Sequence, residues 1–384
     1  MPSPQISVIV PTINEAGNLP FLMQRVDAAL IGRQYEILIV DDRSVDDTPQ
    51  VCAELAQRHP LTLLTRDRPS NGLSGAVLHG IAHSRGNYLV VMDADLQHPP
   101  EKIPELLAPL ERGQADFVLG SRYVQGGSTQ QGWGILRKIN SRLATLLARP
   151  LAGPTCDPMS EFFACKRQLL DNAHRLTPLG YKIALELLTK SRAQHIREIP
   201  IDFGVRRAGV SKLNIKQQFK YLEHLSRLYD FCFPRCSPVA KFFITTAVGW
   251  GVALALLVAL VARGIRLPWA PPLAYLAAIL STAVFHLRYV RTQYEFLIRP
   301  HPWVDFWIIS VAEWCICLLA AMWFKARVSH PLALESFVFC CGCATVMRYV
   351  LRKEFLLDLR GLYKQERKDD ILHLEEPRQR NKAA

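Results

Sequence analysis

The sequence predicts an α/β domain built on a mostly parallel sheet, followed by an all-α membrane domain of about four transmembrane helices. Up to about residue 235, short apolar runs alternate with segments of helical spacing, which is typical of strand–helix–strand units. Polar residues follow several of these runs, and such residues meet at one edge of a parallel sheet. Four long apolar segments fill most of the remaining chain. The 384 residues therefore divide into a soluble part and a membrane part.

The strands of the soluble part are predicted from short β-rich runs that end in polar residues. We expect them at 6–10, 35–40, 61–64, 89–92, 117–119 and 196–200, with one more after a turn at 155–163. Helical spacing predicts helices at 17–30, 136–148 and 181–191, and another that begins after the turn at 71–75. Right-handed crossovers would connect these strands in parallel.

The run at 89–92 ends in two carboxylates, Asp93 and Asp95, and Gln97 follows before a Pro-Pro pair. Burying such charges without a partner is costly. A hard divalent cation, Mg²⁺ or Mn²⁺, would be a suitable partner, because it takes oxygen ligands and shares them with substrate phosphates. The alternative is that the aspartates only cap the next turn. Carboxylates also end the expected strand at 35–40, and this context favours the metal site.

The sequence also argues against several other kinds of domain, partner and metal site. A dinucleotide-binding domain needs G-x-G-x-x-G after its first strand, whereas this chain has P-T-I-N-E-A-G there. The formal net charge of +12 suits an anionic membrane surface or phosphate-bearing substrates. Nucleic acid is not an expected partner, because no basic stripe is interleaved with aromatic residues. The ten cysteines form no paired C-x-x-C motifs, so neither zinc nor a disulfide framework is expected.

The membrane part begins with an amphipathic stretch at 215–233, which mixes apolar and basic residues as interfacial helices do. Spans of about twenty residues follow at 239–261, 268–287, 303–324 and 332–350. We expect a cytosolic domain at 1–213, a juxtamembrane segment at 214–237, a membrane domain at 238–354 and a cytosolic tail at 355–384. With four spans, the protein would be a multi-pass protein of the cytoplasmic membrane. Its first domain would stay in the cytosol, because no signal peptide precedes the first strand.

Ordered motifs between residue 4 and about residue 214 resemble the family 2 glycosyltransferases, especially the polyprenol-phosphate hexose synthases of the dolichol-phosphate mannose synthase type. The motifs are P-T-I-N-E (11–15), D-D-R-S-V-D-D-T (41–48), G-L-S-G-A (72–76), D-A-D-L-Q-H-P-P-E (93–101), G-S-R-Y (120–123), D-P-M-S (157–160) and F-G-V-R-R-A-G-V-S-K-L (203–213). The resemblance implies a Rossmann-like, nucleotide-sugar-binding domain of the GT-A type. By hydropathy, the four apolar segments resemble the GtrA-type membrane domain of some members.

The resemblance also implies roles for individual residues. The nucleotide would be held by Pro11, Asn14, Glu15, Asp42, Asp93 and Ala94. Mg²⁺ or Mn²⁺ would be bound by Asp93, Asp95 and Gln97. The phosphates, including that of the acceptor, would be held by Arg122, Arg206 and Lys212. These three cations and Asp95 form the expected catalytic set.

The implied reaction moves a hexose, mannose by family default, from GDP-mannose or UDP-glucose to a polyprenyl or dolichyl monophosphate, with inversion. A phosphate monoester is already an anion at pH 7, so no general base is needed. One alternative is transfer to a lipid or glycan hydroxyl. Another is a flippase-like carrier with a regulatory nucleotide-binding domain. Membrane lipids are expected partners, and the transmembrane helices would offer an oligomer interface.

Glu161 departs from the family pattern, because it stands where D-P-M-S-G is usual. A carboxylate there would repel an acceptor phosphate, or serve as a base for a hydroxyl acceptor. We expect it instead to be a surface substitution beside the turn.

Overall fold

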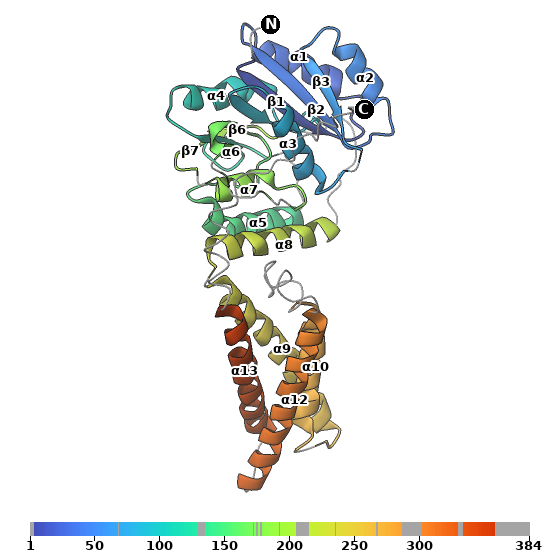
Figure 1. Cartoon of the computed structure of the whole chain (residues 1–384), viewed down its shortest axis with the longest axis vertical. Helices are drawn as coiled ribbons and strands as arrows, with labels where there is room; N and C mark the ends of the chain where they lie inside the picture. Colours follow the sequence, from blue (N-terminus) through green and yellow to red (C-terminus); the bar gives the residue numbers. More distant parts are fainter. Residues whose placement is uncertain are drawn as a thin grey trace, which may run out of the picture. The chain divides into compact units, whose positions relative to one another are not determined.

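The computed structural model describes residues 4–204, 215–285, 302–328 and 333–357, apart from residues 68, 130–134, 172, 174–175, 177–178, 192, 235 and 266–267. These residues form two compact units, of which the first ends at Leu228 and the second begins at Tyr229. Figure 1 shows that the first unit is an α/β domain and that the second is built from helices.

A seven-stranded sheet in the order β3-β2-β1-β4-β6-β5-β7 forms the centre of the first unit. The strands are β1 (Ile6–Thr12), β2 (Tyr35–Asp41), β3 (Leu61–Thr65), β4 (Tyr88–Val91), β5 (Phe117–Ser121), β6 (Phe163–Lys166) and β7 (Ile196–Pro200). β1 is parallel to β2 and β4, β2 to β3, and β5 to β7. β6 is antiparallel to both β4 and β5, so the sheet is mixed. The alternation of strands and helices in the sequence did not reveal that β6 runs in the opposite direction. A helix and a long turn separate β6 from β5, as they would in a parallel crossover.

Helices cover both faces of the sheet. α1 (Leu19–Ala29), α2 (Thr48–Leu55) and α4 (Ile103–Glu111), the last preceded by the 3₁₀ turn η1 (Pro100–Lys102), share a buried core with Val8 and Val10 of β1. Ile9 points to the opposite face, as strand alternation requires. There α3 (Gly72–His83) approaches so closely that a Cβ at Gly80 would lie 2.6 Å from Ile9 Cγ2 and 2.9 Å from Val40 Cγ2.

Three helices form a further layer of the first unit: α5 (Ile135–Ala152), α7 (Ile183–Lys190) and α8 (Ile215–Cys232), with the short α6 (Gln168–Asp171) preceding α7 (Figure 1). Tyr221 Oη on α8 donates a hydrogen bond of 2.8 Å to the carbonyl oxygen of Ala144 on α5. His224 on α8 is hydrogen-bonded to Glu186 on α7, and both side chains are 1% exposed. Lys190 Nζ lies 2.7 Å from Glu186 Oε1. Buried charges therefore anchor the expected amphipathic helix to α7.

The second unit contains α9 (Ser237–Ala262), α10 (Ala270–Phe285), α12 (Pro302–Arg327) and α13 (Ala333–Leu357). Among the described residues, two helical segments are long and apolar enough to cross a membrane, Ser237–Ala262 and Phe306–Arg327, and Ala270–Ala283 is a shorter apolar helix. The helices share a core of small and aromatic side chains. Inside it, Arg348 Nε lies 2.5 Å from Glu313 Oε1, and Arg348 Nη2 donates to Ser310 Oγ.

Candidate active site

The ends of β1 and β2 meet because the two strands pair in parallel with Thr12 opposite Asp41. Beyond this pair the two following loops are tied together. The backbone N–H of Asn14 donates to Ser44 Oγ at 2.7 Å, and that of Val45 donates to Asn14 Oδ1 at 2.8 Å. Asn14 has a positive φ of 55°, which asparagine tolerates better than most residues. The expected nucleotide-binding loops therefore form one surface.

Asp42, at the end of β2, is held by an arginine that sequence reasoning did not identify. Arg66 Nε and Nη2 donate to the two carboxylate oxygens of Asp42, each at 2.6 Å. Arg66 also donates to the carbonyl oxygens of Ser70 and Gly72, so it fixes the turn that enters α3. The clue to this role in the sequence was the position of Arg66 directly after β3, the strand that pairs with β2.

The acidic motif follows β4, the strand that pairs with β1 on its other side. Asp93 is partly exposed and Asp95 is buried. The backbone N–H of Gln97 donates to Asp95 Oδ1 at 3.1 Å. The Gln97 side chain donates through Nε2 to the carbonyl oxygen of Gly204 at 3.0 Å, and the N–H of Gly204 donates back to the Gln97 carbonyl. The motif is therefore a folded turn that is closed by the Asp95 carboxylate and tied through Gln97 to Gly204.

His98 also belongs to this motif, and the sequence did not reveal its role. Its side chain is 3% exposed and stacks on Phe162, with ring centroids 5.3 Å apart. Burial lowers the pKa of His98 to about 4, so the ring is neutral at pH 7. Its Nδ1 accepts the backbone N–H of Asp93 at 3.2 Å. His98 therefore fixes the backbone that carries the first aspartate.

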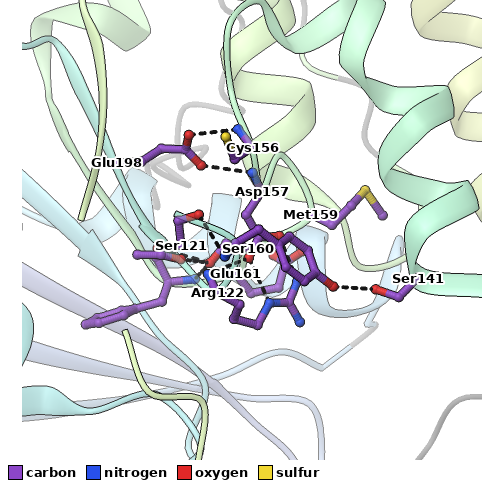
Figure 2. Close-up of polar contacts among 12 residues, drawn as sticks. Ser121, Arg122, Ser141, Cys156, Asp157, Met159, Ser160, Glu161 and Glu198 are labelled. Atoms are coloured by element: carbon purple, nitrogen blue, oxygen red, sulfur yellow. Dashed lines mark hydrogen bonds and ion pairs between the residues drawn. The ribbon is translucent and has the colours of Figure 1, made fainter. Parts of the chain in front are cut away.

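Arg122, at the end of β5, is bound on one edge by a buried carboxylate (Figure 2). Asp157 is fully buried and accepts the Arg122 backbone N–H at 3.0 Å, Nε at 2.7 Å and Nη2 at 2.8 Å. Glu198 on β7 in turn accepts the backbone N–H groups of Cys156 and Asp157, at 2.7 and 2.8 Å. Burial alone would lower the pKa of Arg122, but Asp157 raises it above its ordinary value. Arg122 is therefore a fixed, permanently charged cation.

Phe203 joins the acidic turn to this cation. Its ring centroid lies 5.4 Å from that of His98 and 5.3 Å from the guanidinium carbon of Arg122. The charged ends of β4 and β5 thus border one site, although β6 lies between these strands in the sheet.

Glu161 is buried, and the expectation of a surface substitution was wrong. Its side chain is 7% exposed, and its Oε1 lies 3.2 Å from Lys182 Nζ. Burial raises the pKa of Glu161 to about 8, against the opposing effect of Lys182, while the nearby Asp93 carboxylate raises it further. The turn at 157–160 folds inward because Ser160 Oγ donates to the carbonyl oxygen of Gly120 at 2.7 Å, and the next residue is carried in with it.

The structure brings some of the expected site residues together. Around the strand ends lie Pro11, Asn14, Glu15, Asp42, Asp93, Ala94, Asp95, Gln97 and Arg122. Arg206 and Lys212 lie outside the described residues. The residues that the sequence analysis missed are Arg66, His98, Lys182 and Glu198.

The chain matches the glycosyl transferase family 2 model over residues 7–173. It is 42% identical over 227 residues to the dolichol-phosphate mannosyltransferase of Pyrococcus furiosus, a match that covers 58% of this chain and 63% of that protein. The chain thus spans somewhat less than two thirds of that relative. The enzyme of the same name from Mycosarcoma maydis is 42% identical, with 60% of this chain and 81% of the relative covered. That from Saccharomyces cerevisiae is 39% identical, with coverages of 60% and 88%.

Solved structures similar to the chain include glucosyl-3-phosphoglycerate synthase from Mycobacterium tuberculosis in complex with Mn²⁺, UDP-glucose and phosphoglyceric acid. It is 21% identical, covers 60% of this chain and 80% of its own, and gives a TM-score of 0.45.

Proposed function

The chain belongs to glycosyl transferase family 2, where its relatives are dolichol-phosphate mannosyltransferases, and we propose that it transfers mannose from a nucleotide sugar to a polyprenyl or dolichyl monophosphate with inversion. One observation carries the proposal: the acidic turn after β4 and the buried cation Arg122 after β5 border one site, joined by Phe203. Such a site can bind a diphosphate and a second phosphate close to each other.

The residues of the acidic turn suit a divalent metal ion. Asp93, Asp95 and Gln97 offer carboxylate and amide oxygens, the ligands that Mg²⁺ and Mn²⁺ prefer. Within the described residues, no group of three or more His, Cys, Asp or Glu side chains is placed to hold a metal ion by itself, so substrate phosphates would complete the coordination. Such an ion neutralises the charge that develops on a nucleoside diphosphate leaving group. His98 supports this role because it holds the backbone N–H of Asp93.

The remaining residues of the site would bind the two substrates and orient them. We assign the nucleotide to the surface formed by Pro11, Asn14, Glu15, Asp42, Asp93 and Ala94. Arg122, with Arg206 and Lys212, would hold the phosphate oxygens, and Asp157 keeps the Arg122 guanidinium in one orientation for this purpose. The acceptor phosphate is already an anion at pH 7. Positioning two anions in line, rather than removing a proton, is therefore the main task of the side chains.

A membrane location is part of the proposal. It is supported by Ser237–Ala262 and Phe306–Arg327, which are long and apolar enough to span a bilayer. We propose that all four helices of the second unit cross the membrane as a GtrA-like domain, with residues 1–213 in the cytosol. On α5 and α8, large apolar side chains are solvent-exposed although the helices belong to an α/β unit: Leu143, Leu146, Phe219 and Leu222. These suit a surface that approaches lipid.

A hydroxyl acceptor is the second candidate, and the buried Glu161 is the observation that favours it. A hydroxyl, unlike a phosphate, must lose a proton during transfer, and a carboxylate could accept it.

The test is a transfer assay with the purified full chain, Mn²⁺ or Mg²⁺, a polyprenyl phosphate and labelled GDP-mannose or UDP-glucose. We expect label in the organic phase, and at least a hundredfold lower rate for Asp95→Asn, about 2.7 kcal/mol of transition-state stabilisation. Asp116→Asn is the matched control, because Asp116 pairs with Lys166 away from this turn and its loss should leave the rate unchanged. If the donor is bound or hydrolysed without transfer to lipid phosphate, the acceptor assignment is wrong.

A further inference from the structure

Glu161 combines deep burial with unused hydrogen-bonding capacity. Apart from the contact with Lys182, its two carboxyl oxygens have no hydrogen-bond partner among the described residues, although both are buried. The ion pair with Lys182 compensates only part of the cost of removing a carboxylate from water. A carboxyl group has several acceptor positions and, when protonated, one O–H donor, so a ligand with several hydroxyl groups fits here.

The surroundings of Glu161 indicate which part of the substrates lies nearby. Phe163 of β6 lies opposite Val91 of β4 and Leu119 of β5, and β6 runs antiparallel to both. Glu161, two residues before Phe163, therefore lies beside Asp93 and next to Arg122. In the proposed reaction, Asp93 is on the side of the departing diphosphate and Arg122 is on the side of the acceptor phosphate. In a single displacement, the transferred sugar must lie between these two groups.

The chemistry of the pair suits hydroxyl groups. Because its pKa is raised to about 8, the Glu161 carboxyl group is mostly protonated at pH 7, so it can both donate hydrogen bonds to the neighbouring hydroxyls of a sugar ring and accept hydrogen bonds from them. Lys182 supplies a donor beside it, and its ammonium group is fixed by the carbonyl oxygen of Met159 at 2.6 Å and by the ring of Tyr181 at 4.7 Å. We propose that Glu161 and Lys182 form the subsite for the hydroxyl groups of the transferred hexose. This inference rests on the proposed function, because it assumes a nucleotide-sugar donor.

The experiment compares binding of a nucleotide sugar with binding of its nucleotide alone. Calorimetry on the full chain in detergent, with Mn²⁺ present, gives Kd for GDP-mannose and GDP, and for UDP-glucose and UDP. For the donor that the wild type binds, Glu161→Gly should raise Kd of the nucleotide sugar about tenfold or more, as expected when one or two hydrogen bonds to the hexose are lost. Kd of the nucleotide alone should change less than twofold, because the nucleotide lacks the hexose.

Two further variants guard against a misfolded protein. Glu161→Gln keeps one acceptor oxygen and should cause a smaller loss in the same direction, and Lys182→Met should resemble Glu161→Gly. Glu111→Gln, which removes an exposed carboxylate paired with Arg33, is the control and should change neither Kd.

The possible outcomes are distinct. Equal weakening of the nucleotide and the nucleotide sugar, or no weakening of either, would refute the subsite. Unchanged donor binding with a raised KM for a glycan acceptor would assign the same hydroxyl chemistry to the acceptor. Unchanged binding with turnover abolished in Glu161→Gln would make the residue a base instead. A wild type that binds neither nucleotide sugar would contradict the proposed function itself, whereas lipid-phosphate transfer with unaltered donor binding in Glu161→Gly would contradict only the subsite.

Discussion

Replacing Asp157 by asparagine should separate the stability of the site from its chemistry. The substitution keeps the shape of the side chain but places an amide where a fully buried carboxylate accepts three N–H groups from Arg122. One amide oxygen cannot replace two charged acceptors, and the amide nitrogen would face other donors. Removing one partner of a buried ion pair typically costs about 3–5 kcal/mol. For a unit of this size, each kcal/mol lowers Tm by roughly 2–4 °C, so we expect Tm to fall by about 6–20 °C.

The assay is thermal unfolding of the purified full chain in detergent, together with the transfer rate at a temperature where both proteins are folded. Arg122→Met combined with Asp157→Leu should recover most of the lost Tm, because replacing both ions by apolar groups is often nearly neutral. It should not recover transfer, since the proposed phosphate-binding cation is gone. A Tm for Asp157→Asn within about 2 °C of the wild type would show that Arg122 does not depend on this carboxylate, and the reasoning would fail.

Three further predictions concern the other charged groups. Burial would raise the pKa of Glu186, but His224 and Lys190 lower it from its ordinary 4.5 to about 2. The cluster should therefore stabilise the fold above about pH 4.5 and lose this contribution as the pH falls toward 2, so Tm between pH 6 and pH 3 should fall less steeply in Glu186→Gln than in the wild type. His98→Phe keeps the stack but removes the acceptor for the Asp93 N–H, and kcat/KM should fall about tenfold with little change in Tm. Chelation by EDTA should abolish transfer, and added Mn²⁺ or Mg²⁺ should restore it, whereas persistent activity would remove the metal role from the acidic turn.

The sequence was informative where one local pattern determines the outcome. The apolar run before Asp93 and the parallel order of β1, β2 and β4 follow from short-range periodicity and from right-handed crossovers, so the meeting of their ends could be foreseen. The helices of the second unit lie close to the expected spans for the same reason. In these cases the composition and length of a segment decide whether it forms a strand or a helix.

The partners of the charged residues could not be foreseen, because they depend on contacts between distant segments. Arg66 meets Asp42 across 24 positions, and Glu198 reaches the backbone of Asp157 across 41. The antiparallel insertion of β6 brings the turn before it into the site, which is why Glu161 is buried rather than exposed. No local pattern encodes such a reversal.

These partners also constrain how the site can bind two anions. Three cations near the strand ends are engaged with carboxyl groups: Arg122 with Asp157, Arg66 with Asp42, and Lys182 with Glu161. The Arg122–Asp157 and Arg66–Asp42 pairs are formally neutral, so they do not offset the negative charges of Asp93 and Asp95. A nucleoside diphosphate and a lipid phosphate cannot be brought together in such a field without additional positive charge. A divalent ion, Arg206 and Lys212 are the sources that the sequence offers. The reaction we propose therefore draws on these sources to bind its two anions, and a metal held by the acidic turn would also supply charge to the leaving group.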